Sequence, residues 1–310
     1  MKKIISVLLL VVLTVVTLTA CAGDNGVESN AFASAGSNSV PTSSDASSFN
    51  DGKEIVVISR EDGSGTRGAF IELFGIEQKN DDGTRKDLTT KEAIIAKQTD
   101  VMMTNIAGES YAIGYISLGS LNDMVKALDI EGITPTAENV KNGSYPIARP
   151  FNIATKSDVS ELTEDFINFI LAAEGQEVVA KSYIAIVAGS PAYAGNKPSG
   201  KIVVAGSSSV TPIMEKLKEA YMEINPNATI EIQLSDSSAS ITGTIDGTCD
   251  IGMASRDLKD SELEKLTSTQ IALDGIAVVV NHENPNTNLT KDQIKAIFTG
   301  EVLTWSEAVQ

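Results

Sequence analysis

The chain has few of the residues on which most enzymes depend. Its 310 residues include one histidine, His282, and two cysteines. A lone histidine in the turn sequence NHENPN is more often solvated than catalytic, and no Cys/His cluster indicates a zinc site. Ser64 and Ser208 do not lie in Gly-x-Ser-x-Gly, and DGSGTRG lacks the Gly-Lys-Ser/Thr of a P-loop. The sequence therefore predicts neither an enzyme nor a resident metal or cofactor.

Positive charge is also scarce. The chain has 24 Lys and Arg against 41 Asp and Glu, which gives a formal net charge of -17. A field of this sign repels nucleic acid and anionic membrane surfaces, so nucleic-acid binding is excluded. A small anion would have to be held by local dipoles and a few placed cations. Because 42% of the residues are hydrophobic, we expect one large or two medium cores.

The N-terminus resembles an export signal for a lipoprotein. Lys2 and Lys3 precede the apolar residues 4–16, and the sequence LTAC ends at Cys21. This run is short for a membrane span, and lipoprotein processing needs a small residue before a cysteine. We expect lipid on Cys21 to hold the protein at the outer face of a Gram-positive-type cell membrane; the alternative is an uncleaved anchor. Cys249 then remains alone, which excludes a disulfide framework and favours a small buried residue.

Two stretches of small and polar residues divide the rest of the chain. Residues 22–53 offer almost nothing to bury, so they are predicted to form a disordered tether after a signal peptide at 1–21. Residues 187–200, VAGSPAYAGNKPSG, form a second break between two structured halves. Elsewhere apolar strands alternate with helical patterns, which predicts an α/β fold with mostly parallel sheets flanked by helices.

Three predicted units share one design, a strand followed by a Ser- or Gly-rich turn and a helix. The strands and turns are 201–205 with GSSS, 229–234 with SDSS, and 54–59 with REDGSGT. Thr211 is expected to cap the helix after the first turn, and Gly75 to end the helix after the third. Each unit therefore places its turn at the carboxyl end of a strand and the amino end of a helix.

Such turns can hold an anion, because a helix amino terminus presents free N–H groups and a partial positive charge. Three converging turns would bind a tetrahedral oxyanion. Gly63 and Gly65 would let the backbone approach closely, and Arg60 would supply one guanidinium. Hydroxyl donors would come from Ser64, Thr66, Ser208 and Ser237. Any single turn could equally be an ordinary capped helix. Asp62 has three readings: it pairs with Arg60, which we favour, it accepts the proton of a protonated oxyanion, or it caps its own turn.

Several blocks together resemble the phosphate-binding lipoproteins of high-affinity phosphate ABC importers. They are IVVAGSSSVTPIMEKL, IEIQLSDSSASI, CDIGMASRDLKDSE, LDGIAVVVNHENP, LTKDQIKAIFTGEVLTWSE, IVVISREDGSGTRGAF, YAIGYISLGSL and YPIARPFNIATK. The resemblance covers nearly all of residues 54–310. It implies a two-lobed periplasmic-binding-protein fold of type II that closes about a hinge on inorganic phosphate. It also implies a monomer that delivers phosphate to the permease subunits and ATPase of an ABC transporter.

The blocks occur in a circularly permuted order relative to that family. The block at residue 201 comes first in the usual chain, and the block at residue 54 follows the tryptophan block. We expect one lobe from 120–277, the other from 54–119 plus 278–310, and residues 187–200 as the joint between the usual ends. The alternative is a break in the gene model or a truncated tandem.

The resemblance also implies the ligand contacts, which are Arg60, Ser64, Gly65, Thr66, Ser208, Ser209, Ser237 and Ser255, with Ser207 as an additional candidate. Ser255 departs from well-known members, which place a proton-accepting carboxylate there. Arg256 is either a second cationic contact or a surface residue paired with Asp257 or Asp260. Sulfate, molybdate or another tetrahedral oxyanion, and a phosphate sensor without a transport role, stay as alternatives. A surface phosphatase is disfavoured by the lone histidine.

Overall fold

The structure is a computed structural model, and it describes residues 49–80, 85–186 and 189–309. The predicted signal peptide, its Cys21 and most of the predicted tether lie outside these residues. Within the described part of the chain, no helix combines the length and the apolar character needed to cross a membrane.

Strands and helices alternate along the chain, as predicted. The strands are β1 (Val56–Arg60), β2 (Glu77–Lys79), β3 (Arg85–Asp87), β4 (Ile94–Ala96), β5 (Ala112–Ser117), β6 (Lys126–Ala127), β7 (Asp129–Ile130), β8 (Ala148–Thr155), β9 (Gly200–Ser207), β10 (Ala228–Ser235), β11 (Ile251–Ala254), β12 (Thr267–Val280) and β13 (Asn288–Leu289). The helices are α1 (Gly65–Leu73), α2 (Thr99–Gly108), η1 (Leu118–Ser120), α3 (Ala137–Lys141), α4 (Glu161–Leu171), α5 (Ala173–Ala180), α6 (Thr211–Ile224), α7 (Ser237–Asp246), α8 (Asp260–Leu263), α9 (Lys291–Thr299) and α10 (Trp305–Ala308).

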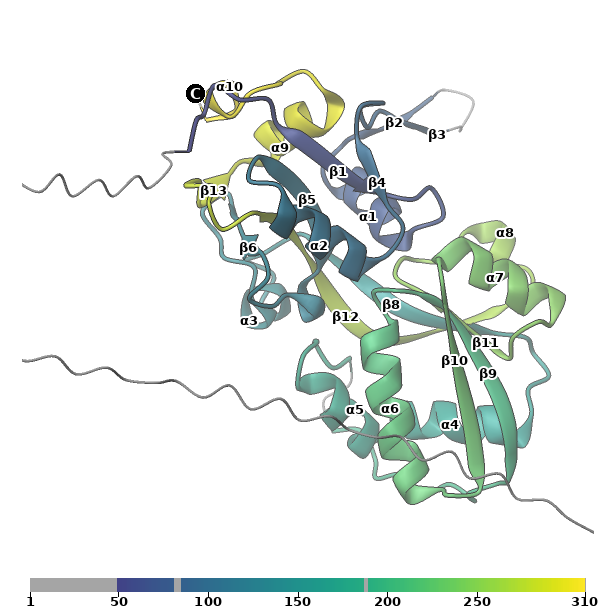
Figure 1. The fold of residues 1–310 in the computed structure, drawn as a ribbon. Helices are drawn as coiled ribbons and strands as arrows, with labels where there is room; N and C mark the ends of the chain where they lie inside the picture. Colours follow the sequence, from purple (N-terminus) through teal and green to yellow (C-terminus); the bar gives the residue numbers. More distant parts are fainter. Residues whose placement is uncertain (1–48, 81–84, 187–188, 310) are drawn as a thin grey trace, which may run out of the picture. The chain divides into compact units, whose positions relative to one another are not determined.

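The main sheet has the strand order β10-β9-β11-β8-β12-β5-β1-β4 (Figure 1). Strands β10, β9 and β11 run parallel at one end, and β5, β1 and β4 run parallel at the other. The central strands β8 and β12 pair antiparallel with each other and with their neighbours. The sheet is therefore mixed rather than mostly parallel, because two long antiparallel strands join the two parallel sets.

Strand β12 belongs to both halves of the sheet. Its residues 267–275 pair with β8, and its residues 276–280 pair with β5. The strand crosses from one parallel set to the other without a loop. Strands β8 and β12 are therefore the connection about which the two halves can move relative to each other.

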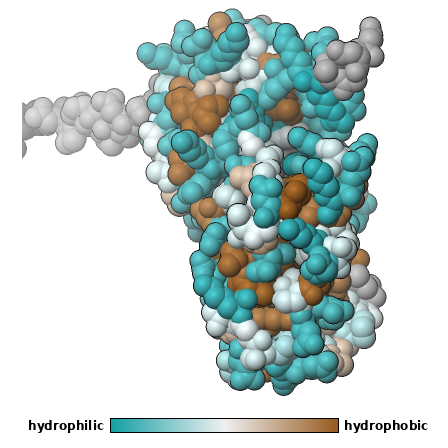
Figure 2. All heavy atoms as spheres, turned by 90° about the vertical axis from the view of Figure 1, so that its right-hand side faces the viewer, coloured by the Kyte–Doolittle hydropathy of each residue, from teal (hydrophilic) through white to brown (hydrophobic). Residues whose placement is uncertain are grey.

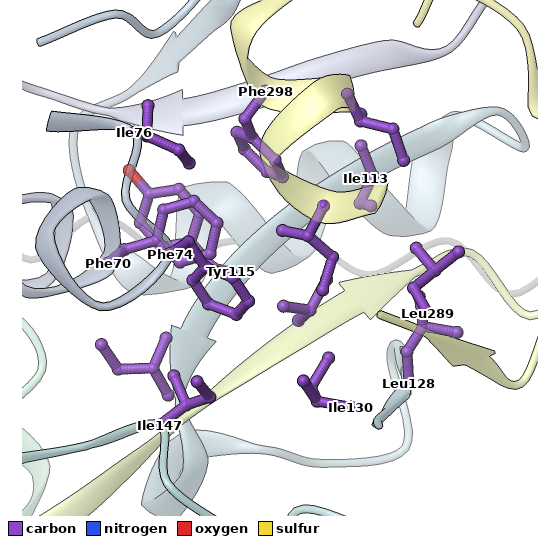
Figure 3. Packing of buried hydrophobic residues seen from close by; sticks show 14 of the residues in the cluster. Phe70, Phe74, Ile76, Ile113, Tyr115, Leu128, Ile130, Ile147, Leu289 and Phe298 are labelled. Atoms are coloured by element: carbon purple, nitrogen blue, oxygen red, sulfur yellow. The ribbon is translucent and has the colours of Figure 1, made fainter. Parts of the chain in front are cut away.

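Two large apolar clusters define the two lobes. The first packs α1, β5 and α9 around Phe70, Tyr115 and Phe298, and Figure 3 shows these rings in contact. The second packs α4, α5 and α6 around Phe166 and Tyr221. We call them the α1 lobe and the α6 lobe.

The segment between β5 and β8 belongs to the α1 lobe. Leu128, Ile130, Val140 and Ile147 are buried in its apolar cluster. Strand β7 also pairs with β13 of the same lobe. This differs from the predicted lobe of residues 120–277. The packing differs because this segment covers the part of β12 that pairs with β5, and the crossing between lobes comes only at β8.

The last residues of the predicted tether are packed against the lobe. Phe49 lies with its ring 4.9 Å from that of Tyr111 and 6.3 Å from that of Trp305. The Ile55 amide donates to the Leu303 carbonyl at 2.8 Å. The tether prediction is therefore wrong for residues 49–53, because the Phe49 ring packs on two aromatic rings and the Asp51 carbonyl accepts from the Ser306 amide at 2.8 Å.

The described part of the predicted joint, residues 189–200, packs on the α6 lobe. Asp165 of α4 accepts hydrogen bonds from the Tyr193 hydroxyl, from the Tyr221 hydroxyl at 2.7 Å and from the Asn196 amide at 3.0 Å. The Ala173 amide at the start of α5 donates to a carbonyl of this segment at 2.9 Å. The segment is thus tied to the three helices that it passes.

The protein face in Figure 2 is mostly hydrophilic, with hydrophobic atoms in separate patches. Scattered apolar surface of this kind is ordinary for a folded protein.

Candidate anion-binding site

Three polar turns from the two lobes meet at one place. The turn after β1 in the α1 lobe contacts the turn after β9, because Arg60 Nη2 donates to Ser208 Oγ at 3.0 Å. Thr66 Oγ1 lies 2.8 Å from Ser209 Oγ. The same turn contacts the turn after β10, where the Ser238 amide donates to the Gly63 carbonyl at 3.2 Å. The convergence that the sequence analysis proposes is present in the structure.

Arg60 is the buried cation of this meeting point. It is 2% exposed and forms a fork with Glu61, with Nε 2.9 Å from one carboxylate oxygen and Nη2 2.8 Å from the other. Its Nε also donates to the Ala96 carbonyl at 3.2 Å. These contacts fix the plane of the guanidinium, so that Nη2 points at the serine turn.

The predicted pairing of Asp62 with Arg60 is wrong. The Asp62 side chain is 97% exposed and pairs with Arg67 at 3.0 Å. The turn after β1 directs Asp62 to solvent, whereas Glu61 lies along the guanidinium of Arg60. Asp62 is thus outside the buried part of the cluster.

Helix amino termini accompany each turn. Ser64 caps α1 by accepting from the Arg67 amide at 3.3 Å, and Asp236 caps α7 by accepting from the Ala239 amide at 2.8 Å. Helix α6 begins without a side-chain cap, because Thr211 donates to the Ser207 carbonyl instead. The prediction that Thr211 caps this helix is therefore wrong, while Gly75, with φ of 65°, follows the end of α1 as predicted. Pro212 has no N–H, and the Ile213 and Met214 amides donate to the Val210 carbonyl at 3.2 and 3.1 Å, so the α6 terminus offers an anion few free N–H groups.

Buried serines fill the space between the turns. Ser207 Oγ donates to Ser255 Oγ at 2.9 Å, and the Ser255 amide donates to Ser237 Oγ at 3.2 Å. Gly65 lies against them so closely that a Cβ on it would be 2.6 Å from Ser237 Oγ and 2.7 Å from Ser255 Oγ. Ser237 and Ser255 are fully buried. The hydroxyls of three segments of the α6 lobe thus face the amino terminus of α1.

Arg256 borders this cluster, with Nη2 3.5 Å from Ser238 Oγ. Its guanidinium forms a fork with Glu262, with distances of 2.8 and 2.9 Å. The ion pair forms with Glu262 and not with Asp257 or Asp260, because α8 brings Glu262 back over the turn that follows β11. Asp257 contributes its backbone carbonyl, which accepts from Arg256 Nη1 at 2.8 Å.

The lone histidine and the cysteine Cys249 have different surroundings. His282 is exposed, with Nε2 2.9 Å from the Asp123 carbonyl, and Cys249 is buried, as predicted. Among the described residues, no three His, Cys, Asp or Glu side chains gather as a metal ion would require.

Sequence reasoning missed Thr99 and Glu61. Thr99 is 5% exposed, and its Oγ1 lies 3.2 Å from Ser208 Oγ and 3.4 Å from Ser209 Oγ. It begins α2 after β4, so it belongs to a fourth strand–turn–helix unit. The turn sequence KQT before that helix has no glycine or serine, and this is why the unit did not stand out.

A second buried arginine, Arg149, lies beside the serine cluster. Its Nη1 donates to the Ser255 carbonyl at 3.1 Å, and its Nη2 pairs with Asp274 at 3.2 Å. Burial lowers the pKa of Arg149, which the Asp274 carboxylate opposes. Burial also raises the pKa of Asp274 to about 6, against the charge of Arg149 and its hydrogen-bond donors. Nothing in the sequence around either residue indicates this pair.

Two α/β lobes joined by paired strands, with polar turns and a buried arginine where the lobes meet, define a two-lobed solute-binding protein. Residues 26–174 and 191–310 match the family described as the PBP superfamily domain. The chain is 52% identical over 267 residues to the phosphate-binding protein PstS 2 of Streptococcus agalactiae, covering 86% of this chain and 91% of the relative. It therefore belongs to the PBP superfamily and, within it, to the family of the PstS phosphate-binding proteins.

Further comparisons agree with this assignment. The PstS 2 protein of Streptococcus pneumoniae serotype 4 is 47% identical over 255 residues, covering 82% of this chain and 87% of the relative. The crystal structure of a phosphate-binding protein of a phosphate ABC transporter from Streptococcus pneumoniae TIGR4 is similar, with a TM-score of 0.66 and 46% identity. That match covers 82% of this chain and 99% of the neighbour.

Proposed function

We propose that this protein binds inorganic phosphate between its two lobes and delivers it to an ABC permease and its ATPase. The observation that carries the proposal is the meeting of Arg60 with the serine turns of the opposite lobe. Membership of the PstS family supports phosphate as the ligand. A net charge of -17 makes such a local arrangement necessary, because the overall field opposes the approach of an anion.

The proposed ligand contacts are the residues that converge on this point. Arg60 supplies charge in a fixed plane, and the amino termini of α1 and α7 supply N–H groups. Hydroxyls and the glycine backbone complete the shell, from Ser64, Gly65, Thr66, Ser207, Ser208, Ser209, Ser237 and Ser255. Closure about β8 and β12 would bring both sets onto the ligand together.

One observation favours a second candidate ligand, a fully ionised oxyanion such as sulfate. A carboxylate that accepts a proton from the ligand is a simple way to select protonated phosphate. Here Ser255 occupies the position predicted for that carboxylate, and its hydroxyl can donate a hydrogen bond as well as accept one. The nearby Glu61 is engaged by Arg60, and Asp236 Oδ1 accepts from the Ala239 amide. Competition between phosphate and sulfate at neutral pH distinguishes the two ligands.

The test is calorimetric titration of the full chain, purified in mild detergent and stripped of ligand, with phosphate and then with sulfate as competitor. We expect tight phosphate binding that Arg60→Ala weakens by about 10-fold or more, since hydrogen bonds to charged groups are worth about 1.5–3 kcal/mol. Arg85→Ala is the control, because Arg85 is exposed and its ion pairs among the described residues are with Glu72 and Glu77 of the same lobe. An Arg60→Ala protein that binds phosphate as tightly as the parent refutes the site.

We also propose that the chain is circularly permuted relative to the usual order of this family. Residues that would be joined in the usual chain order lie together near the two ends of the structured part, since the Ile55 amide donates to the Leu303 carbonyl and Glu54 forms a β-bridge with Thr304. The Bacillus subtilis PstS protein matches only 36% of this chain, as expected when a relative has the two halves in another order. A chain that starts at residue 200, joins residue 309 to 54 and ends at residue 186 should fold and bind with the parent affinity. Loss of binding by a folded chain of this kind contradicts the permutation.

The proposed location is the outer face of the cell membrane, with lipid on Cys21. The motivating feature is the sequence LTAC after a short apolar run. Labelling of cells with a fatty-acid analogue should mark the parent but not a Cys21→Ser variant. Equal labelling of both would refute the lipid attachment at this residue.

A further inference from the structure

A buried ion pair lies where the two lobes join. Arg149 of β8 and Asp274 of β12 are 3% and 1% exposed. They are direct partners in the β8–β12 ladder, and two residues further along, at Ile276, β12 begins to pair with β5. The pair therefore occupies the strand connection about which the lobes can move.

The same pair reaches the serine cluster through one residue. Arg149 Nη1 donates to the Ser255 carbonyl at 3.1 Å, while the Ser255 hydroxyl and amide bond to Ser207 and Ser237. Ser255 thus links the turn after β9 to the start of α7. The guanidinium of Arg149, which lies on strand β8 of the lobe connection, holds Ser255 in place.

The charge of Arg149 also bears on the site. Its pKa is lowered mainly by burial, and the positive charge of Arg60 lowers it further, so the two buried guanidinium groups repel each other. Arg149 Nε is buried without a hydrogen-bond partner among the described residues. Two buried cations beside a cluster of hydroxyl donors form an arrangement that an anion would stabilise.

We propose that Arg149 and Asp274 are a positioning pair for the bound oxyanion: Arg149 fixes Ser255 and adds positive charge, and Asp274 sets how much of that charge the ligand experiences. The inference rests on the proposed function of the serine cluster as an oxyanion site. It assigns roles to two residues outside the ligand contacts proposed above, and it connects the site to the strands that join the lobes.

The groups around Asp274 define how the pair responds to pH. Arg149 faces it from β8, the Gly119 amide donates to its Oδ1 at 3.2 Å, and the Ser117 hydroxyl and Tyr183 are its other polar neighbours. Tyr183 stays neutral because burial raises its pKa. Asp274, with a pKa of about 6, is mostly ionised at pH 8 and mostly protonated at pH 5. Protonation leaves the charge of Arg149 uncompensated, which favours an anion.

The experiment is calorimetric titration of the full chain with inorganic phosphate at pH 5, 6, 7 and 8, for the parent, Arg149→Met, Arg149→Lys and Asp274→Asn. Arg149→Met should weaken binding about 10-fold or more. Arg149→Lys keeps the charge but has no fork to reach both partners, so its loss should be smaller. Asp274→Asn should bind roughly 3-fold or more tightly than the parent at pH 8 and equally at pH 5.

Comparing variants with the parent at one pH removes the titration of phosphate itself. Equal affinity of Arg149→Met and the parent, or a ratio between Asp274→Asn and the parent that does not change with pH, overturns the inference. Thermal melting without ligand checks folding, and Arg149→Lys and Asp274→Asn decide the matter where Arg149→Met does not fold. A parent that binds no phosphate overturns the proposed function and this inference with it. A parent that binds, loses binding on Arg60→Ala and ignores the Arg149 variants overturns the inference alone.

Discussion

A close contact between the lobes at the candidate site suggests a test of closure by a single methyl group. Gly65 begins α1, and a Cβ added to it would lie 2.6 Å from Ser237 Oγ and 2.7 Å from Ser255 Oγ of the other lobe. Both distances are below 3.0 Å, so the lobes have to separate or the serine hydroxyls have to move. Gly65→Ala therefore acts on the arrangement of the two lobes and hardly on the packing within either.

The expected magnitude follows from the cost of overpacking. Extra methyl groups in a close-packed contact cost about 1–3 kcal/mol, which corresponds to phosphate affinity weaker by roughly 5-fold to 150-fold. The ligand-free protein can relieve the contact by opening. Since alanine also restricts the unfolded chain more than glycine does, the melting temperature without phosphate should be unchanged or slightly higher.

Titration calorimetry and small-angle scattering measure the two halves of this expectation. Gly65→Ala should bind phosphate more weakly and show a smaller decrease in radius of gyration when phosphate is added. Gly68→Ala is the matched control, because it lies one turn further along α1 and the nearest side-chain atom to its added Cβ would be Cδ of Arg256, at 4.0 Å. If Gly65→Ala binds as tightly as Gly68→Ala and the parent, the lobes do not close on the ligand through this contact.

Three further outcomes are expected. Gly206→Ala should lower the free energy of unfolding by about 2–4 kcal/mol in a denaturant titration, because φ of 139° disfavours a side chain and the Cβ would lie 2.4 Å from the Met253 carbonyl oxygen; a loss below about 0.5 kcal/mol contradicts this. Phe49→Ala should cost about 1–2 kcal/mol through its lost aromatic contacts, and an unchanged melting temperature would show that this ring adds nothing. Asp274 has a raised pKa, so its contribution to stability is complete below about pH 4 and is lost as the pH rises through about 6; Asp274→Asn should flatten that part of the stability profile, and a parallel profile refutes the assignment.

Local features of the fold were predictable because they depend on neighbouring residues. Hydrophobic periodicity located β1, β9 and β10 to within two residues of their ends. Ser64 lies directly before α1 as its cap, and Gly75 adopts the left-handed conformation after it. Short-range hydrogen bonds and backbone sterics decide all of these features, and both depend on residues that are neighbours in the sequence.

Two predictions from the sequence differ from the structure because the path of the backbone decides them. Glu61 and Asp62 are equally near Arg60 along the chain, and only the path of the turn after β1 decides which carboxylate meets the guanidinium. The sequence predicts a lobe boundary near residue 120, whereas the chain between β5 and β8 packs in the α1 lobe. Both depend on where the backbone goes next, which periodicity does not specify.

The sequence by itself determined the α/β class, the polar turns at strand ends and the family, since each depends on residues that are neighbours or on many blocks read together. Only the tertiary structure decided that Arg60 faces Ser208 across the lobes and that Arg149 pairs with Asp274. These partners are 148 and 125 residues apart in the chain. Their contact exists because β12 passes from one half of the sheet to the other, and no local rule of sequence fixes that path.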